Sequence, residues 1–64
     1  MNIDSTKWYS ARKAADFLEV TEDTVKRHCR DGELKNEAKQ RGPKKQWHVK
    51  GSSIIALRKK WKLD

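Results

Sequence analysis

The chain has 64 residues, of which 34% are hydrophobic and 39% are charged, and its 16 Lys and Arg outnumber its 9 Asp and Glu to leave a net charge of +7. A chain of this length forms a single domain and buries only about 60% of the surface that its unfolded state exposes, so its core must be thin. The longest apolar run, Ile54–Leu57, is too short to span a membrane. The regular spacing of the apolar residues excludes a disordered chain.

The positive charge is concentrated in one part of the chain. Residues 1–24 contain three Lys and Arg against five acids, whereas residues 25–64 contain thirteen against four. Such a surface predicts a polyanionic partner, usually nucleic acid and less often an anionic membrane, and here we expect no membrane. The alternative is a basic surface that serves only solubility. The lone cysteine, Cys29, and the lack of an apolar N-terminal run predict a cytoplasmic protein.

The N-terminal part predicts a first short helix. Residues 1–7 are polar and are expected to be flexible. Trp8 and Tyr9 follow as a short extended segment, and Ser10 is the N-cap of a helix that reaches about Glu19. The buried side of this helix carries Ala14, Ala15, Phe17 and Leu18.

A second helix is predicted over residues 22–31. Thr21 is its N-cap, and Val20 and Val25 are placed to form a hydrophobic staple. Gly32 is expected to end the helix in the left-handed conformation. Because only three residues separate the two helices, we expect them to cross steeply, as in a helix-turn-helix.

The apolar spacing changes to a period of two after this helix. The alternation that starts at Leu34 and Ala38 resumes at Trp47 and Val49, beyond the turn-forming residues 40–45. This pattern predicts a β-hairpin with a loop of about six residues.

Residues 51–53, Gly-Ser-Ser, are expected to end the hairpin and to cap a third helix. The buried side of this helix carries Ile54, Leu57 and Trp61. All three tryptophans, Trp8 included, are expected in the core, with Trp47 joining the hairpin to the third helix. We therefore expect a mainly helical α+β domain over residues 8–62, followed by a tail at 63–64. Its order is helix, turn, helix, hairpin, helix.

The face of the second helix opposite Val25 and Cys29 is the first candidate for nucleic-acid contact. Arginine there can bond bidentately to guanine in the major groove, and threonine can contact a thymine methyl or a phosphate. The alternative is a solvated face whose cations pair with local acids. The candidate residues are Asp23, Thr24, Lys26, Arg27 and Arg30.

The hairpin is the second candidate, because cations gather around its turn and on the side away from the core. Such an element could follow phosphates or enter the minor groove. The alternative is a hairpin kept charged to prevent edge pairing. The candidate residues are Lys39, Arg41, Lys44, Lys45, Gln46 and His48.

Catalytic and metal sites are not predicted. His28, Cys29 and His48 have no spacing that matches a zinc module. The chain has no phosphate-cradling glycine loop and no carboxylate pair placed for acid–base work. We expect no cofactor, no metal and no enzyme activity.

The stretch "YSARKAADFLEVTEDTVKRHCRDGEL", followed by a basic turn, "QWHV" and a short helix, resembles the MerR-like winged helix-turn-helix family. Within that family it is similar to the small excisionases of phages and integrative elements. The resemblance covers about residues 8–61. It implies a recognition helix at about 22–30 in the major groove and a hairpin wing at about 39–45 near the minor groove. Two features depart from the family: the acids Glu22 and Asp23, and a wing longer than usual.

The resemblance implies a protein that binds double-stranded DNA and organises it for a site-specific recombinase (integrase). Because no dimerising coiled coil follows Trp61, it implies monomeric binding or cooperative self-association on repeated sites. Two alternatives stay open. One is a phage or plasmid transcriptional regulator with the same DNA-binding mode, and the other is an adaptor that offers its basic face to an acidic protein.

Overall fold

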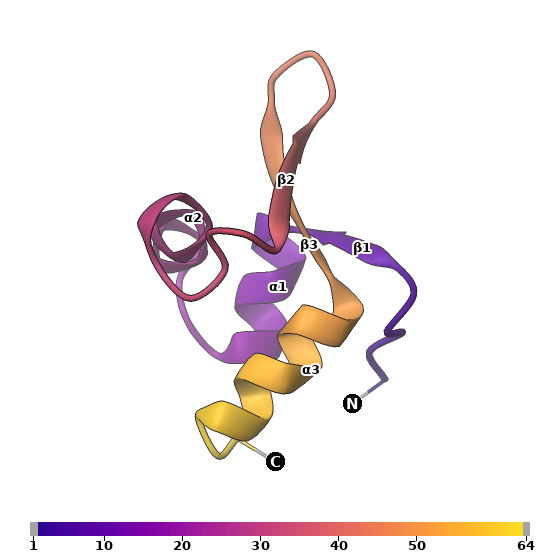
Figure 1. Cartoon of the computed structure of the whole chain (residues 1–64), viewed down its shortest axis with the longest axis vertical. Helices are drawn as coiled ribbons and strands as arrows, with labels where there is room; N and C mark the ends of the chain where they lie inside the picture. The colour runs from indigo at the N-terminus through magenta and orange to yellow at the C-terminus, as the bar shows by residue number, and fades with distance from the viewer. Residues whose placement is uncertain (1, 64) are drawn as a thin grey trace.

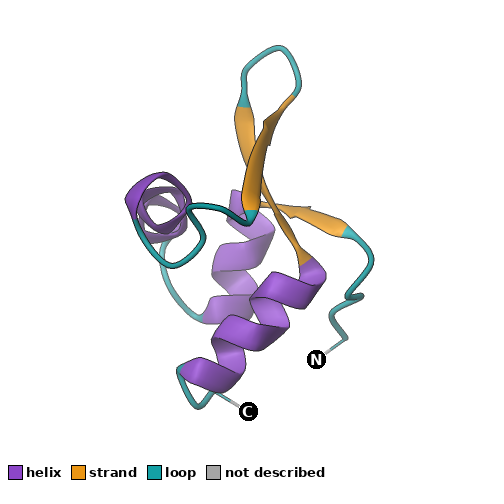
Figure 2. Cartoon of the chain, in the orientation of Figure 1, coloured by secondary structure: helices purple, strands orange, loops and turns teal. Residues whose placement is uncertain are grey.

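The computed structural model describes residues 2–63. These residues form three helices and one three-stranded antiparallel sheet, which confirms the expected mixed α+β class. Figures 1 and 2 show the arrangement. The elements are β1 (Trp8–Ser10), α1 (Ala11–Leu18), α2 (Glu22–Asp31), β2 (Ala38–Arg41), β3 (Gln46–Lys50) and α3 (Gly51–Lys60).

The first two helices begin at the residues that the sequence indicated. The Ser10 hydroxyl accepts a hydrogen bond from the Lys13 N–H at 3.3 Å, and the Thr21 hydroxyl accepts one from the Thr24 N–H at 3.2 Å. Each cap satisfies an N–H group that has no partner within its own helix. Glu19 ends α1 in the left-handed conformation, with φ of 57°, so the chain turns at once toward α2. Figure 1 shows α2 almost end-on while α1 does not share its axis, so the two helices cross steeply as expected.

Gly32 ends α2, but not in the left-handed conformation that we expected. Its φ of −121° and ψ of −144° lie outside the left-handed region. Glycine is required there for a different reason, because a Cβ atom at this position would lie 2.9 Å from the Cα of His28 and 2.6 Å from its Nδ1. Glycine is therefore needed at position 32 because the chain passes close to His28 in the last turn of α2, and not because of a positive φ.

The segment after Gly32 is a series of turns. The first strand of the hairpin was expected to start at about Leu34, and this is wrong, because β2 starts only at Ala38. The Leu34 N–H donates to the carbonyl of His28 at 3.1 Å, and the Leu34 carbonyl accepts from the N–H groups of Glu37 and Ala38 at 3.0 Å each. Leu34 is almost completely buried, with 1% of its surface exposed. These turns place the Leu34 side chain in the hydrophobic core.

The expected two-stranded hairpin is part of a three-stranded sheet with the order β1-β3-β2. β1 pairs with β3 through Trp8 opposite Lys50 and Tyr9 opposite Val49. The hairpin pairs Arg41 with Gln46, so its turn has four residues, 42–45, instead of about six. Figure 1 shows that the tip of the hairpin projects beyond the helices.

The core lies where α1, α2 and α3 meet the covered face of the sheet (Figure 2). It includes the expected buried sides of α1 and α2, and Ile54 and Leu57 from α3. Trp61 packs on its edge and reaches α2, where its ring lies 5.4 Å from that of His28. The buried residues are Ala11, Ala14, Ala15, Phe17, Leu18, Val25, Cys29, Leu34, Val49, Ile54 and Leu57.

The start of α3 differs from expectation in its capping. The helix begins at Gly51 itself, and no side chain caps it. The N–H groups of Gly51 and Ser52 instead donate to the carbonyls of Lys7 and Ser5, at 2.8 and 3.2 Å. The N-terminal segment that we expected to be flexible therefore holds the start of α3 in this structure. A Cβ atom on Gly51 would lie only 1.9 Å from the Asp4 carbonyl oxygen, so this contact requires glycine.

At the other end of α3, Arg58 is buried although its side chain is charged. Its guanidinium donates hydrogen bonds to the carbonyls of Phe17 and Leu63, which joins the end of α1 to the C-terminal turn. Of the expected tail, Leu63 is thus part of the fold, whereas Asp64 lies outside the described residues, as does Met1. No helix in residues 2–63 is both long enough and apolar enough to cross a membrane.

Candidate nucleic-acid interface

The exposed face of α2 gathers four of the five side chains that the sequence singled out on it. Because Asp23, Arg27 and Arg30 are spaced four and three residues apart, they form one stripe along the helix. With Lys26 and Trp47 they line a shallow hollow of about 380 Å³. The side chains of Lys26, Arg27 and Arg30 therefore share one open surface beside β3.

Thr24 does not belong to this surface. It is partly buried, and its hydroxyl lies 2.8 Å from that of Thr21. Thr24 thus takes part in the hydrogen bonding that starts α2, and a direct contact with a ligand would have to disturb that capping.

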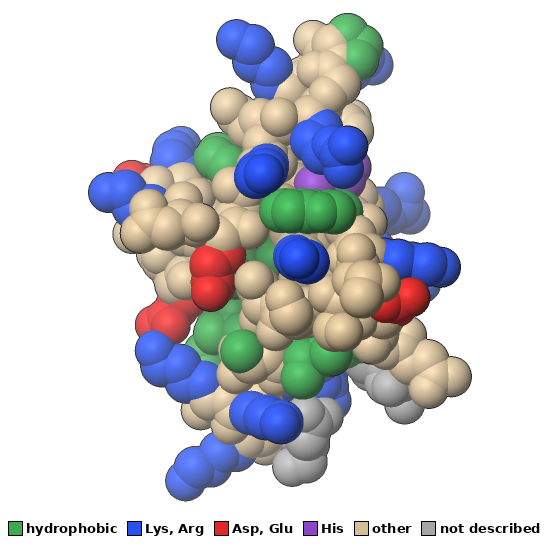
Figure 3. All heavy atoms as spheres, turned by 45° about the vertical axis from the view of Figure 1, so that its right-hand side comes forward, with side chains coloured by type: hydrophobic (Ala, Val, Ile, Leu, Met, Phe, Trp, Pro, Cys, Tyr) green, Lys and Arg blue, Asp and Glu red, His purple; other side chains and the backbone are tan. Residues whose placement is uncertain are grey.

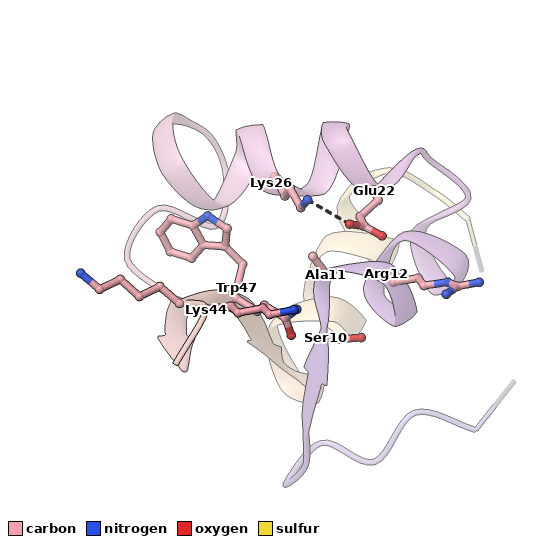
Figure 4. A pocket seen from close by; sticks show the side chains of 9 residues that line it. Ser10, Ala11, Arg12, Glu22, Lys26, Lys44 and Trp47 are labelled. Atoms are coloured by element: carbon pink, nitrogen blue, oxygen red, sulfur yellow. Dashed lines mark ion pairs between the residues drawn. The ribbon is translucent and has the colours of Figure 1, made fainter. Parts of the chain in front are cut away.

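A second hollow of about 540 Å³ lies between α2, the start of α1 and the hairpin turn. It shares Lys26 and Trp47 with the first, so the two hollows adjoin each other beside α2. Figure 4 shows the Trp47 side chain pointing from β3 toward α2. We name this surface the α2–hairpin cleft; its lining residues are Ser10, Ala11, Arg12, Glu22, Asp23, Lys26, Arg27, Arg30, Lys44, Lys45, Gln46 and Trp47.

Two of the three cations on α2 are paired with acids of the same helix. The Lys26 Nζ lies 3.0 Å from Glu22 Oε2, and the hydrogen bond and charge of that carboxylate raise the pKa of Lys26. Arg30 Nε lies 3.0 Å from Asp31 Oδ2. Both pairs are largely exposed, so solvent screens them and they are weak. Among residues 2–63, Arg27 has no such pair, which leaves its guanidinium available to a ligand.

The predicted hairpin residues lie on two different sides of the hairpin. Lys44 and Lys45 belong to the turn and line the α2–hairpin cleft together with Gln46. Lys45 has a left-handed backbone, with φ of 49°, and its N–H donates to the Gly42 carbonyl at 3.0 Å. This hydrogen bond closes the turn and fixes the place from which the two lysines extend.

The other three predicted hairpin residues, Lys39, Arg41 and His48, face away from the core. Lys39 pairs with His48 across the strands, whereas Gln40 pairs with Trp47. Because successive residues of a strand point to opposite faces, Lys39 and His48 lie on the side of the sheet opposite Trp47. The structure therefore does not bring these three residues together with α2.

Trp47 belongs to the cleft, although we had expected it to join the hairpin to the third helix. It is partly buried and lines both hollows beside α2. The alternation correctly placed Trp47 on the same side as Val49. Alternation could not show which helix lies beside Trp47. The neighbour is α2 and not α3, because the hairpin extends beyond α3.

The cysteine and histidines do not assemble a metal site. No group of three or more His, Cys, Asp or Glu side chains suited to a metal ion occurs in the described residues. Cys29 is buried in the core, and this burial raises the pKa of its thiol to about 11. The thiol therefore stays protonated at neutral pH and lacks the thiolate that nucleophilic or metal chemistry requires.

The comparisons with known proteins identify no relative of this chain: no protein-family model, no curated protein and no solved structure matches it significantly.

Proposed function

We propose that this protein is a winged helix-turn-helix protein that binds double-stranded DNA in a sequence-specific way. In this proposal α2 enters the major groove and the β2–β3 hairpin acts as the wing. The observation that carries the proposal is the convergence of cations from α2 and the hairpin turn on one cleft, with Lys26, Arg27, Lys44 and Lys45 among them. A surface of this kind neutralises phosphates on two sides of a groove.

The dimensions of α2 support this mode of binding. Ten residues make a helix of roughly 15 Å, and a major groove about 12 Å wide admits a single α-helix. Arg27 is exposed at the middle of the stripe and has no acidic partner in the described residues. Its guanidinium is therefore the best candidate for bidentate contact with guanine. Lys26 and Arg30 would each have to break a weak ion pair, with Glu22 and Asp31 respectively, before binding a phosphate or a base.

For the biological role, we propose an excisionase-like architectural factor that assists a site-specific recombinase. This part rests on the sequence resemblance given above. A transcriptional regulator would use the same contacts, so the identity of the bound sites decides between the two roles. Sites beside a recombination core favour excision, and sites that overlap a promoter favour regulation.

The test begins with selection of bound sites from randomised duplexes, followed by titrations of the selected and scrambled sites. Arg27→Ala should cost about 1–3 kcal/mol on the selected site and little on the scrambled one. Lys44→Ala should weaken both sites equally and reduce the salt slope by about one. Lys59→Ala removes the same charge from the exposed side of α3 and is the matched control.

Two results would overturn the proposal. Absence of duplex binding at about 50 mM salt, or binding without salt dependence, would exclude a phosphate-contacting surface and favour an adaptor that binds an acidic protein. Selected-site preference that survives Arg27→Ala would show that α2 does not read the bases.

A further inference from the structure

Trp8 occupies an unusual place in this fold. It was expected in the core, but its pairing with Lys50 in β3 puts it on the face of the sheet that the helices do not cover. The neighbouring residue, Tyr9, faces the helices, and its ring meets that of Phe17 edge-on with the centroids 5.2 Å apart. Trp47 and Trp61 both pack against the hydrophobic core, whereas Trp8 is partly exposed and does not. Trp8 is therefore a large apolar ring that contributes little to the thin core.

The side chains around Trp8 are basic. Strand alternation and register place Lys39, Arg41, His48 and Lys50 on the same face as Trp8. The Lys39 ammonium lies over the Trp8 ring, 5.4 Å from its centroid. β1, β2 and β3 contain no acidic residue. Figure 3 shows this side of the molecule, with apolar surface bordered by Lys and Arg side chains and a histidine. We name these five residues the outer sheet face.

The five residues of this surface differ from those that line the α2–hairpin cleft, although the register also puts Ser10 and Gln46, which line the cleft, on the same face of the sheet. The cleft lies on the side of the hairpin toward which Trp47 points, and the outer sheet face lies on the opposite side. None of its five residues lines either hollow of the cleft.

A half-exposed aromatic ring among cations, on a sheet without acids, has the composition of a surface that binds single-stranded nucleic acid. Such surfaces combine cations that follow the phosphates with aromatic rings on which unpaired bases stack. Lys39 and Arg41 are two residues apart in β2, so they lie roughly 7 Å apart along the strand. This is about twice the 3.4 Å rise per nucleotide of a stacked duplex strand, which suits an extended strand whose bases are free.

We propose that the outer sheet face binds single-stranded nucleic acid, with one base stacked on Trp8 and the flanking phosphates held by Lys39, Arg41 and Lys50. The Lys39 side chain is long and exposed, so its ammonium can move off the Trp8 ring when a base stacks there and can then bind a phosphate. The proposal does not depend on duplex binding by α2, because the two surfaces share no residue.

The test measures the affinity for a labelled oligothymidylate by fluorescence anisotropy. Trp8→Leu keeps apolar bulk but removes the aromatic ring, and it should weaken binding about 5- to 150-fold, the range for loss of one stacked base. An abasic strand of equal length should bind the unaltered protein more weakly by a comparable factor. Trp61→Phe, at the far end of α3, should leave the affinity unchanged.

Unaltered affinity of Trp8→Leu would overturn the proposal, and so would equal affinity for the abasic strand and the oligothymidylate. Failure of the unaltered protein to bind oligothymidylate would also overturn it. If circular dichroism shows that Trp8→Leu does not fold, a variant with Trp47→Phe and Trp61→Phe leaves Trp8 as the only tryptophan. Its emission should be quenched during titration with oligothymidylate, and absence of quenching would refute stacking.

Discussion

Removal of the Glu22 carboxylate is expected to strengthen duplex binding if the α2–hairpin cleft is the DNA interface. Glu22 lines the cleft and holds the Lys26 ammonium at 3.0 Å. In the free protein this acid therefore neutralises a cation that a phosphate could use. Glu22→Gln keeps the size of the side chain but frees Lys26, so DNA no longer has to compete with an internal carboxylate.

The magnitude follows from counterion release. One additional phosphate contact makes the slope of log K against log salt steeper by about 0.9. The affinity gain of Glu22→Gln should thus be largest at low salt and should shrink about 3.5-fold between about 50 and 200 mM. Titration of the selected duplex at several salt concentrations measures both quantities, and a thermal melt checks that loss of an acid from the first turn of α2 leaves the protein folded.

Glu33→Gln is the matched control, because it removes the same charge from a pair outside the cleft. Glu33 Oε2 lies 2.6 Å from Lys60 Nζ, so this change also frees a lysine. If both variants raise the affinity and the slope equally, the effect comes from overall charge and the assignment of the cleft is refuted. An unchanged slope in Glu22→Gln would show that Lys26 does not contact phosphate.

Two further predictions concern stability. Gly51→Ala would place a Cβ atom 1.9 Å from the Asp4 carbonyl oxygen, so it should displace residues 4–7 and destabilise the fold by roughly 1–3 kcal/mol through loss of two backbone hydrogen bonds. Urea denaturation measures this cost; Ser52→Ala is the control, and hydrogen exchange that leaves residues 4–7 unaffected would contradict the reasoning. Burial raises the pKa of the Cys29 thiol from 9.0 to about 11, so the folded state retains this proton to higher pH than the unfolded state. Its contribution to stability is fully present below pH 9 and should be lost as the pH rises toward 11, by at most about 1.4 kcal/mol per pH unit. Cys29→Ala should remove that part of the pH dependence, and identical slopes in the two proteins would refute it.

The local features of this protein could be read from neighbouring residues. The starts of α1 and α2 depend on Ser10 and Thr21, whose hydroxyls reach N–H groups only three residues away. The stripe of Asp23, Arg27 and Arg30 follows from helical geometry once Val25 and Cys29 are known to be buried. Much of the candidate site on α2 was therefore predictable, because each of these relations lies within one or two helical turns.

The same reasoning failed where a residue's role depends on a distant segment. Residues 51–53 looked like a capping sequence, but the N–H groups at the start of α3 are satisfied by backbone carbonyls of residues 5 and 7. Leu34 fits an alternating strand, yet its N–H donates to the His28 carbonyl at the end of α2 and the backbone turns there with the side chain buried. Neither segment has a local sequence pattern that predicts these hydrogen-bond partners.

The clearest contrast is between Trp8 and Trp47. Length and charge determined that this chain is a small, strongly basic domain, the spacing of its apolar residues indicated the mixed α+β class, and alternation determined that Trp47 shares a side with Val49. A strand of only three residues has no alternation that could tell which of Trp8 and Tyr9 faces the core. Pairing of β1 with β3 decided it, because Tyr9 lies opposite the buried Val49 and Trp8 opposite the exposed Lys50. The face on which a side chain lies is set by hydrogen bonds to a strand forty residues away, and only the folded chain brings those residues together.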